Sequence, residues 1–147
     1  MRSCAIMALI RVTSLLATEL NEAQVLAGLG AIALDPETWR RDTLALMSDA
    51  ASGGVLLART EAGRACGLLH YRILGAEDDG PCLQVERLVA FDLTEPRRIA
   101  DRLITEVTRL ARLQRCDSLR LVRPLDSPAD ASALVLASGV ADLHSVF

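Results

Sequence analysis

The sequence predicts a single α/β domain in which a mixed, mostly antiparallel sheet carries helices on both faces. Three strand-like runs follow one another over residues 55–90, which indicates an antiparallel meander. A long amphipathic stretch over residues 95–114 comes next and leads to a short apolar strand, an order that implies a helical crossover between strands. The 147 residues are 51% hydrophobic, so residues 1–147 are expected to form one domain with its own core.

The elements before the meander begin with a strand over residues 8–13. A helix is expected over residues 17–34, and four apolar residues are expected on its inner side: Leu20, Ala23, Val25 and Leu26. A second helix is expected to begin at Asp35-Pro36, because an aspartate cap followed by a proline in the first turn is a strong start signal. Trp39 lies in this helix, which is expected to end near Ala51.

Turn signals delimit the strands of the meander. Ser52-Gly53-Gly54 precedes the first strand, a tight connection over residues 61–64 follows it, and an acidic, glycine-containing turn over residues 75–81 precedes the third strand. The three strands are expected over residues 55–59, 65–74 and 82–90. Consecutive strands joined by such short turns are predicted to pair as antiparallel neighbours.

The C-terminal third is predicted to alternate helices and strands. The helix over residues 95–114 has apolar residues at helical spacing, namely Ile99, Leu103, Val107, Leu110 and Ala111. A strand over residues 119–122 is expected to lie parallel to the third meander strand, because a helix connects the two. Ser127-Pro128 is expected to start a last helix that runs to Ser138 and stops at Gly139, before a final strand over residues 140–147.

Composition argues against several classes of protein. The net charge is −3 and no long basic run is present, which gives no reason to expect nucleic-acid binding. No apolar stretch approaches the length of a membrane span. Four scattered cysteines form no CxxC pair, so neither a zinc site nor a disulfide framework is expected: Cys4, Cys66, Cys82 and Cys116. These features together predict a cytoplasmic protein in a reducing compartment.

Two segments carry a resemblance to a known family. Glu86-Arg87-Leu88-Val89-Ala90 ends the third meander strand, and Leu103 follows Ala90 by thirteen residues. The segment between them contains Glu95-Pro96-Arg97-Arg98-Ile99-Ala100 at the start of the long helix. In the order of its elements and in this spacing, the chain resembles the GNAT superfamily of acyl-CoA N-acyltransferases over nearly its whole length, with a degenerate cofactor-binding motif.

The resemblance implies acetyl-CoA as cosubstrate. It also implies that the strand over residues 119–122 splays from the third meander strand toward their C-terminal ends and leaves a wedge for the pantetheine arm. It assigns the pantetheine arm to the backbone amides of Leu88 and Ala90, and the pyrophosphate to the start of the long helix. There the family has Arg or Gln followed by two small residues, whereas this chain has Glu95, then Arg98, and keeps only the small Ala100. Glycine amides would be replaced as phosphate ligands by the side chains of Arg97 and Arg98.

The resemblance also implies a base for an amine acceptor. Glu86 stands where several GNAT enzymes carry the carboxylate that deprotonates the amine, and strand alternation places it on one face with Gln84. His70 on the neighbouring strand is the second candidate base. A structural interpretation stays open for each: a surface carboxylate paired with an arginine, and a histidine that only packs.

One further residue bears on activity. The family often has a tyrosine four residues before the glycine that ends the last helix, where it protonates the leaving thiolate. Counting back from Gly139 gives Val135, which carries no proton to donate. Two hypotheses therefore stand: an N-acetyltransferase acting on a small-molecule or peptide amine, and a catalytically inactive GNAT-like module that has lost CoA. A third hypothesis is a structural subunit that pairs through its open sheet edge or its apolar surface, for example as a homodimer.

Overall fold

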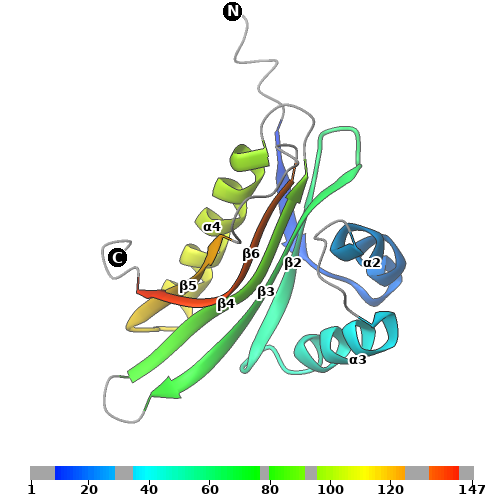
Figure 1. The fold of residues 1–147 in the computed structure, drawn as a ribbon. Helices are drawn as coiled ribbons and strands as arrows, with labels where there is room; N and C mark the ends of the chain where they lie inside the picture. Colours follow the sequence, from blue (N-terminus) through cyan, green and yellow to red (C-terminus); the bar gives the residue numbers. More distant parts are fainter. Residues whose placement is uncertain (1–8, 29–34, 77–79, 92–95, 125–132, 143–147) are drawn as a thin grey trace, which may run out of the picture.

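The computed structural model describes residues 9–28, 35–76, 80–91, 96–124 and 133–142 (Figure 1). The strands are β1 (Arg11–Ser14), β2 (Gly53–Arg59), β3 (Ala65–Ala76), β4 (Gly80–Phe91), β5 (Ser118–Pro124) and β6 (Ala133–Asp142). The helices are the 3-10 turn η1 (Ala17–Glu19), α2 (Leu20–Gly28), α3 (Pro36–Met47) and α4 (Pro96–Leu113). The predicted meander and the long helix that follows it are confirmed.

The strands form one mixed sheet. β1, β2, β3 and β4 pair in sequence order, each antiparallel to the next. β5 runs parallel to β4 but pairs with it only where Cys82, Leu83 and Gln84 face Ser118, Leu119 and Arg120. Beyond that point the two strands diverge as predicted, and β6 lies between them, antiparallel to both.

Helices cover both faces of the sheet, as predicted, and each face has its own core (Figure 1). α4 packs on one face, where Leu83, Leu103 and Val107 are fully buried. α2 and α3 pack on the other face, where Leu57 and Leu68 are fully buried. Among the described residues, none of the helices combines the length and the apolar composition of a membrane span.

Gly67 sets the distance between α4 and the sheet. A Cβ on this residue would lie 2.7 Å from Ile99 Cγ2 and 2.9 Å from Leu103 Cδ1, closer than carbon atoms pack. The absence of a side chain at position 67 therefore lets the helix rest directly on β3.

The N-terminal helices follow the sequence signals with two corrections. The Asp35 carboxylate accepts hydrogen bonds from the Thr38 amide (3.1 Å) and hydroxyl (2.8 Å), which confirms the predicted cap. The helix ends at Met47 rather than near Ala51. Val25, expected on the inner side of α2, is instead 71% exposed. The buried side of this helix is formed by Ala23, Leu26 and Ala27, and Val25 lies on the opposite, solvent-facing side. Residues 29–34 of the predicted helix lie outside the described residues.

The predicted last helix is wrong over residues 133–138, which belong to β6. Its expected start at Ser127-Pro128 lies outside the described residues. The divergence of β4 from β5 leaves an unpaired backbone edge on each strand, and a segment inserted there satisfies both. An apolar run such as Leu134-Val135-Leu136 is ambiguous between helix and strand, so tertiary pairing decides its conformation.

Candidate active site

Strand β4 carries a β-bulge at Glu86. His70 of β3 lies opposite Arg87, and the next residue, Tyr71, lies opposite Val85. Glu86 is therefore the additional residue on β4, without a partner of its own on β3. Bulges of this kind redirect side chains and occur often beside active sites.

The bulge turns two charged residues toward the same face of the sheet. Val85 and Leu88 are three positions apart, yet both are buried in the core beneath α4. The two residues between them, Glu86 and Arg87, both line a cavity on the opposite face. Strand alternation alone had predicted Glu86 there but not Arg87. A signal was present, because the alternate apolar positions Leu83 and Val85 resume at Leu88 instead of at position 87.

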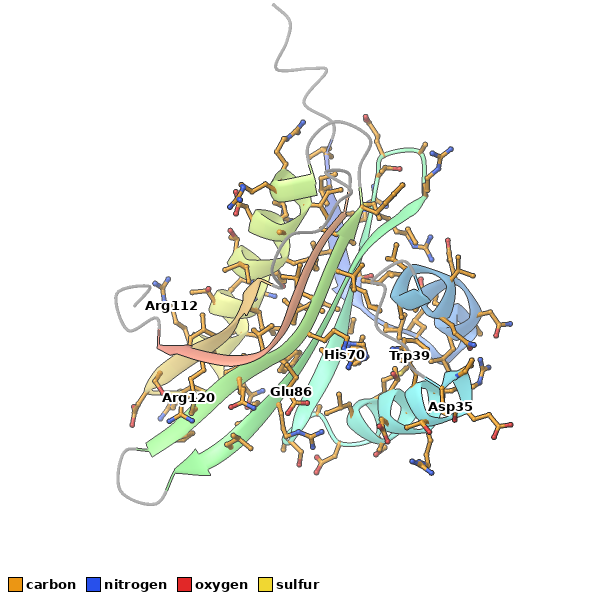
Figure 2. The ribbon with its side chains drawn as sticks, viewed as in Figure 1. Asp35, Trp39, His70, Glu86, Arg112 and Arg120 are labelled. Carbon is orange, nitrogen blue, oxygen red and sulfur yellow. The ribbon has the colours of Figure 1, made fainter. Side chains whose placement is uncertain are left out.

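The cavity lies between α3 and strands β3 and β4 and has a volume of about 300 Å³. Its polar and charged lining consists of Asp42, Thr43, His70, Arg72, Glu86 and Arg87. Trp39, Ala45 and Leu46 of α3 supply the apolar wall. Figure 2 shows Glu86 and His70 projecting from the sheet and Trp39 approaching from the helical layer. The structure thus brings both candidate bases into one cavity.

Glu86 is held at the cavity by its neighbours. Arg72 Nε donates a hydrogen bond to Glu86 Oε2 at 3.1 Å, and Gln84 Nε2 lies 3.5 Å from the same oxygen. About a third of the Glu86 side chain stays exposed (32%), so the carboxylate is reachable by a ligand. A partly exposed carboxylate with one cationic partner is able to accept a proton from a bound ammonium group.

His70 is buried, and its direct side-chain contacts are with neutral groups. Its Nε2 lies 3.1 Å from the Thr43 hydroxyl, and its ring meets Trp39 edge-on, with ring centroids 5.9 Å apart. Its Nδ1 is buried without a partner among the described residues. Burial, together with the Arg87 charge, lowers the pKa of His70 to about 3. The imidazole is therefore neutral at physiological pH and is a weak base.

Arg87 is the cation of the cavity that has no direct partner. Its guanidinium makes no hydrogen bond or ion pair with any residue that the structure describes. Burial lowers the pKa of its guanidinium, while the charges of Glu86 and Asp42 raise it from a distance. Arg72, by contrast, has its charge paired with Glu86.

The segment of β4 expected to hold the pantetheine arm has a strand on each side. Leu88 lies opposite Leu69 of β3 and Leu136 of β6. Ala90 lies opposite Gly67 and Leu134 in the same way. In this conformation β6 therefore occupies the wedge between β4 and β5, where the resemblance had placed the cosubstrate.

The start of α4 presents charge rather than bare backbone. Arg97 is exposed and Arg98 is half-buried in the first turn, which begins at Pro96. Ala100 is buried and packs with the core between α4 and the sheet. Glu95 lies outside the described residues. A helix N-terminus with two arginines is electrostatically suited to an anion.

The structure also bears on two other predictions, which concern the family's tyrosine position and the cysteines. Val135 lies in β6 opposite Val89. Gly139 lies in the same strand and ends no helix, so the comparison of Val135 with the family's tyrosine does not hold. Cys66, Cys82 and Cys116 are buried, and Cys4 lies outside the described residues. Within the described ranges, no group of three or more His, Cys, Asp or Glu residues is placed to hold a metal ion.

Solved structures share this fold. No protein-family profile and no curated protein sequence matches the chain. The aminoglycoside N-acetyltransferase AAC(6')-Iy in complex with CoA is similar with a TM-score of 0.70 and 17% identity, over 83% of this chain and 80% of that one. The enzyme AAC(6')-Ih from Acinetobacter baumannii gives a TM-score of 0.65 and 22% identity, over 80% and 82% of the two chains.

A third similar structure is a GNAT family acetyltransferase from Brucella melitensis in complex with acetyl-CoA. It has a TM-score of 0.59 and 17% identity and covers 89% of each chain. At these identities the similarity establishes the fold, while the function has to be argued from the site.

Proposed function

We propose that this chain, which has the GNAT acetyltransferase fold, is an N-acetyltransferase that moves an acetyl group from acetyl-CoA to a small amine bound in the cavity between α3, β3 and β4. The observation that carries the proposal is the bulge at Glu86, which presents a partly exposed carboxylate to that cavity. An amine attacks an acyl group only when it is deprotonated, so a carboxylate beside the acceptor is the group that the reaction needs.

The residues divide the work as follows. Glu86 accepts the proton of the bound ammonium group, and Arg72 holds the carboxylate in place through its 3.1 Å contact. Arg97 and Arg98, in the first turn of α4, would hold the phosphates of acetyl-CoA. When bound, acetyl-CoA supplies the acetyl group as an activated thioester. His70 is a packing residue in this account, because its neutral ring has a low proton affinity.

Acetyl-CoA binding requires one local rearrangement. The backbone of β4 at Leu88 and Ala90 is paired with residues 134–136 of β6, so this part of β6 has to leave β4 before a pantetheine arm lies against it. The divergence of β4 from β5 after Gln84 and Arg120 supplies the space once β6 is displaced.

The same pairing favours a second candidate function, a non-catalytic GNAT-like module. If β6 stays in the wedge, the fold has replaced its cosubstrate with its own strand. The arginine at position 98, where the family has glycine, is in keeping with such a loss. A cytoplasmic location and a homodimer stay predictions from the sequence under both functions.

Thermal unfolding with and without acetyl-CoA separates the two functions. A chain that binds acetyl-CoA gains about 2.7 kcal/mol in its free energy of unfolding at a concentration 100 times Kd. A non-catalytic module shows no shift at any concentration of acetyl-CoA. Free adenosine diphosphate serves as the control for binding that involves only the phosphates at α4.

A further inference from the structure

Arg87 has an unusual environment for a cation. The residue is half-buried, yet its guanidinium has no hydrogen bond or ion pair among the residues that the structure describes. The acidic residues around it do not meet this need: Glu86 is engaged by Arg72, and Asp42 affects Arg87 only through its charge. Withdrawing a guanidinium from water without a partner costs free energy, so a ligand that supplies an anion here would be stabilised.

Other lining residues also have unused polar atoms. Trp39 Nε1 and His70 Nδ1 are buried and have no partner among the described residues. The indole nitrogen is only a donor, and Arg87 is only a donor. Arg87 offers only hydrogen-bond donors and its acidic neighbour Glu86 is engaged by Arg72, so Arg87 favours a ligand group made of acceptors.

The cavity also has an acidic side and a small volume. Glu86 immediately precedes Arg87 in the chain, and the bulge turns both side chains to the same face of the sheet. A volume of about 300 Å³ is at the lower end of the range for small-molecule sites. Trp39, Ala45 and Leu46 leave an apolar wall for the remainder of such a ligand.

We propose that the acceptor is an amine that carries a carboxylate next to its amino group, an amino-acid-like compound, and that Arg87 binds the carboxylate while Glu86 faces the amino group. The assignment of the amino group rests on the proposed function. The carboxylate site on Arg87 stands on the cavity and its unpaired cation alone, and its binding is measurable without any acetyl transfer. A peptide N-terminus, which has an amide in place of the carboxylate, is the competing class of acceptor.

Calorimetric binding of the common amino acids, each compared with its carboxamide, tests the proposal. At least one amino acid is expected to bind the wild type, and its Kd is expected to rise roughly 10- to 100-fold in Arg87→Gln, the worth of a charge-assisted pair. The Kd of Arg87→Lys should lie between those of the wild type and Arg87→Gln, because lysine keeps the charge but lacks the bidentate geometry of a guanidinium. The matched control is Arg40→Gln: Arg40 lies on α3, bonds Asn21 at 2.9 Å, and does not line the cavity.

The carboxamides distinguish the classes of ligand. Their binding should be weak and should not change between wild type and Arg87→Gln. Equal binding of amino acids and carboxamides, or amino-acid binding that is indifferent to Arg87, overturns the carboxylate site and points to a plain amine or a peptide N-terminus. Absence of binding by every amino acid overturns it as well.

Acetyl transfer measured on the same compounds separates this proposal from the proposed function. Arg87-dependent binding of an amino acid without any turnover keeps the carboxylate site and removes the acetyltransferase. Turnover of carboxamides but not of amino acids keeps the acetyltransferase and removes the carboxylate site. For a substrate amino acid, Arg87→Gln should raise KM by the same 10- to 100-fold and change kcat much less. The reason is that Arg87 binds the carboxylate equally in the ground state and in the transition state.

Discussion

His70 Nε2 lies 3.1 Å from the Thr43 hydroxyl, in a layer where α3 shields the histidine from solvent. Burial, with the nearby Arg87 charge, lowers the pKa of this histidine to about 3. The folded protein therefore resists protonation at His70, whereas the unfolded chain takes up a proton near its ordinary pKa of about 6.5.

The consequence is an acid-sensitive fold. Because the folded-state pKa is the lower one, the stabilisation is fully present above about pH 6.5 and is lost as the pH falls from there toward 3. Between pH 6 and pH 5, His70 alone should lower the free energy of unfolding by about 1.2 kcal/mol, because most unfolded chains but almost no folded ones carry its proton. Urea unfolding at a series of pH values measures this slope.

His70→Gln is the control for this dependence. The variant keeps a polar side chain near Thr43 but has no group at position 70 that titrates in this range. Its free energy of unfolding should therefore change less between pH 6 and pH 5, because the contribution of His70 is missing. Equal slopes in the two proteins would show that His70 is protonated in the folded state, against the burial described above.

Gly67 should not tolerate a side chain. The Cβ of Gly67→Ala would meet Ile99 and Leu103 at 2.7 and 2.9 Å, so the variant is expected to lose about 1–3 kcal/mol through overpacking. The matched control on the same strand is Gly75→Ala, whose Cβ meets no atom within 4 Å. Chemical denaturation of both variants checks the difference, and equal stabilities would contradict the close packing of α4 on β3.

Local signals in the sequence were sufficient for most elements. Asp35-Pro36 fixed the start of α3, glycines and acidic turns separated the meander strands, and the stripe from Ile99 to Ala111 identified α4. Each of these depends on neighbours a few residues away, which is the range that periodicity and capping report.

Long-range relationships were not predictable in the same way. The ion pairs of Arg59 with Glu19 and Glu22, at 2.8 and 2.7 Å, join β2 to the N-terminal helices across about forty residues and have no local signature. Whether residues 133–138 form a helix or a strand depends on the free edges of β4 and β5, which exist only in the assembled sheet. The cavity likewise exists only once α3 packs against β3 and β4.

The position of β6 should respond to the cosubstrate. In the free protein, backbone amides of residues 134–136 that bond to neighbouring strands should be protected from hydrogen exchange. Under the proposed function, acetyl-CoA should remove this protection while β3 stays protected. Fast exchange of residues 134–136 in the free protein would contradict the strand, and binding without any change would contradict the rearrangement.

The two arginines at the start of α4 should carry the phosphates. Arg97→Ala combined with Arg98→Ala is expected to weaken acetyl-CoA binding roughly 10- to 100-fold, because charge-assisted bonds to phosphate are lost. Arg109→Ala on the same helix is the control, since Arg109 is paired with Glu106 and lies near the other end. If the double variant instead binds more tightly, the arginine side chains obstruct the loop rather than hold phosphate.

Release of CoA from acetyl-CoA in the presence of small amines, by wild type and by Glu86→Gln, tests whether Glu86 is the base of an acetyl transfer. We expect amine-dependent release by the wild type and a rate lower by roughly 100-fold or more in Glu86→Gln, which keeps the shape of the side chain and removes the base. Glu61→Gln, in the exposed turn between β2 and β3, should retain the wild-type rate. Equal rates in wild type and Glu86→Gln would contradict the role of the bulge, and no release by the wild type would leave the non-catalytic module.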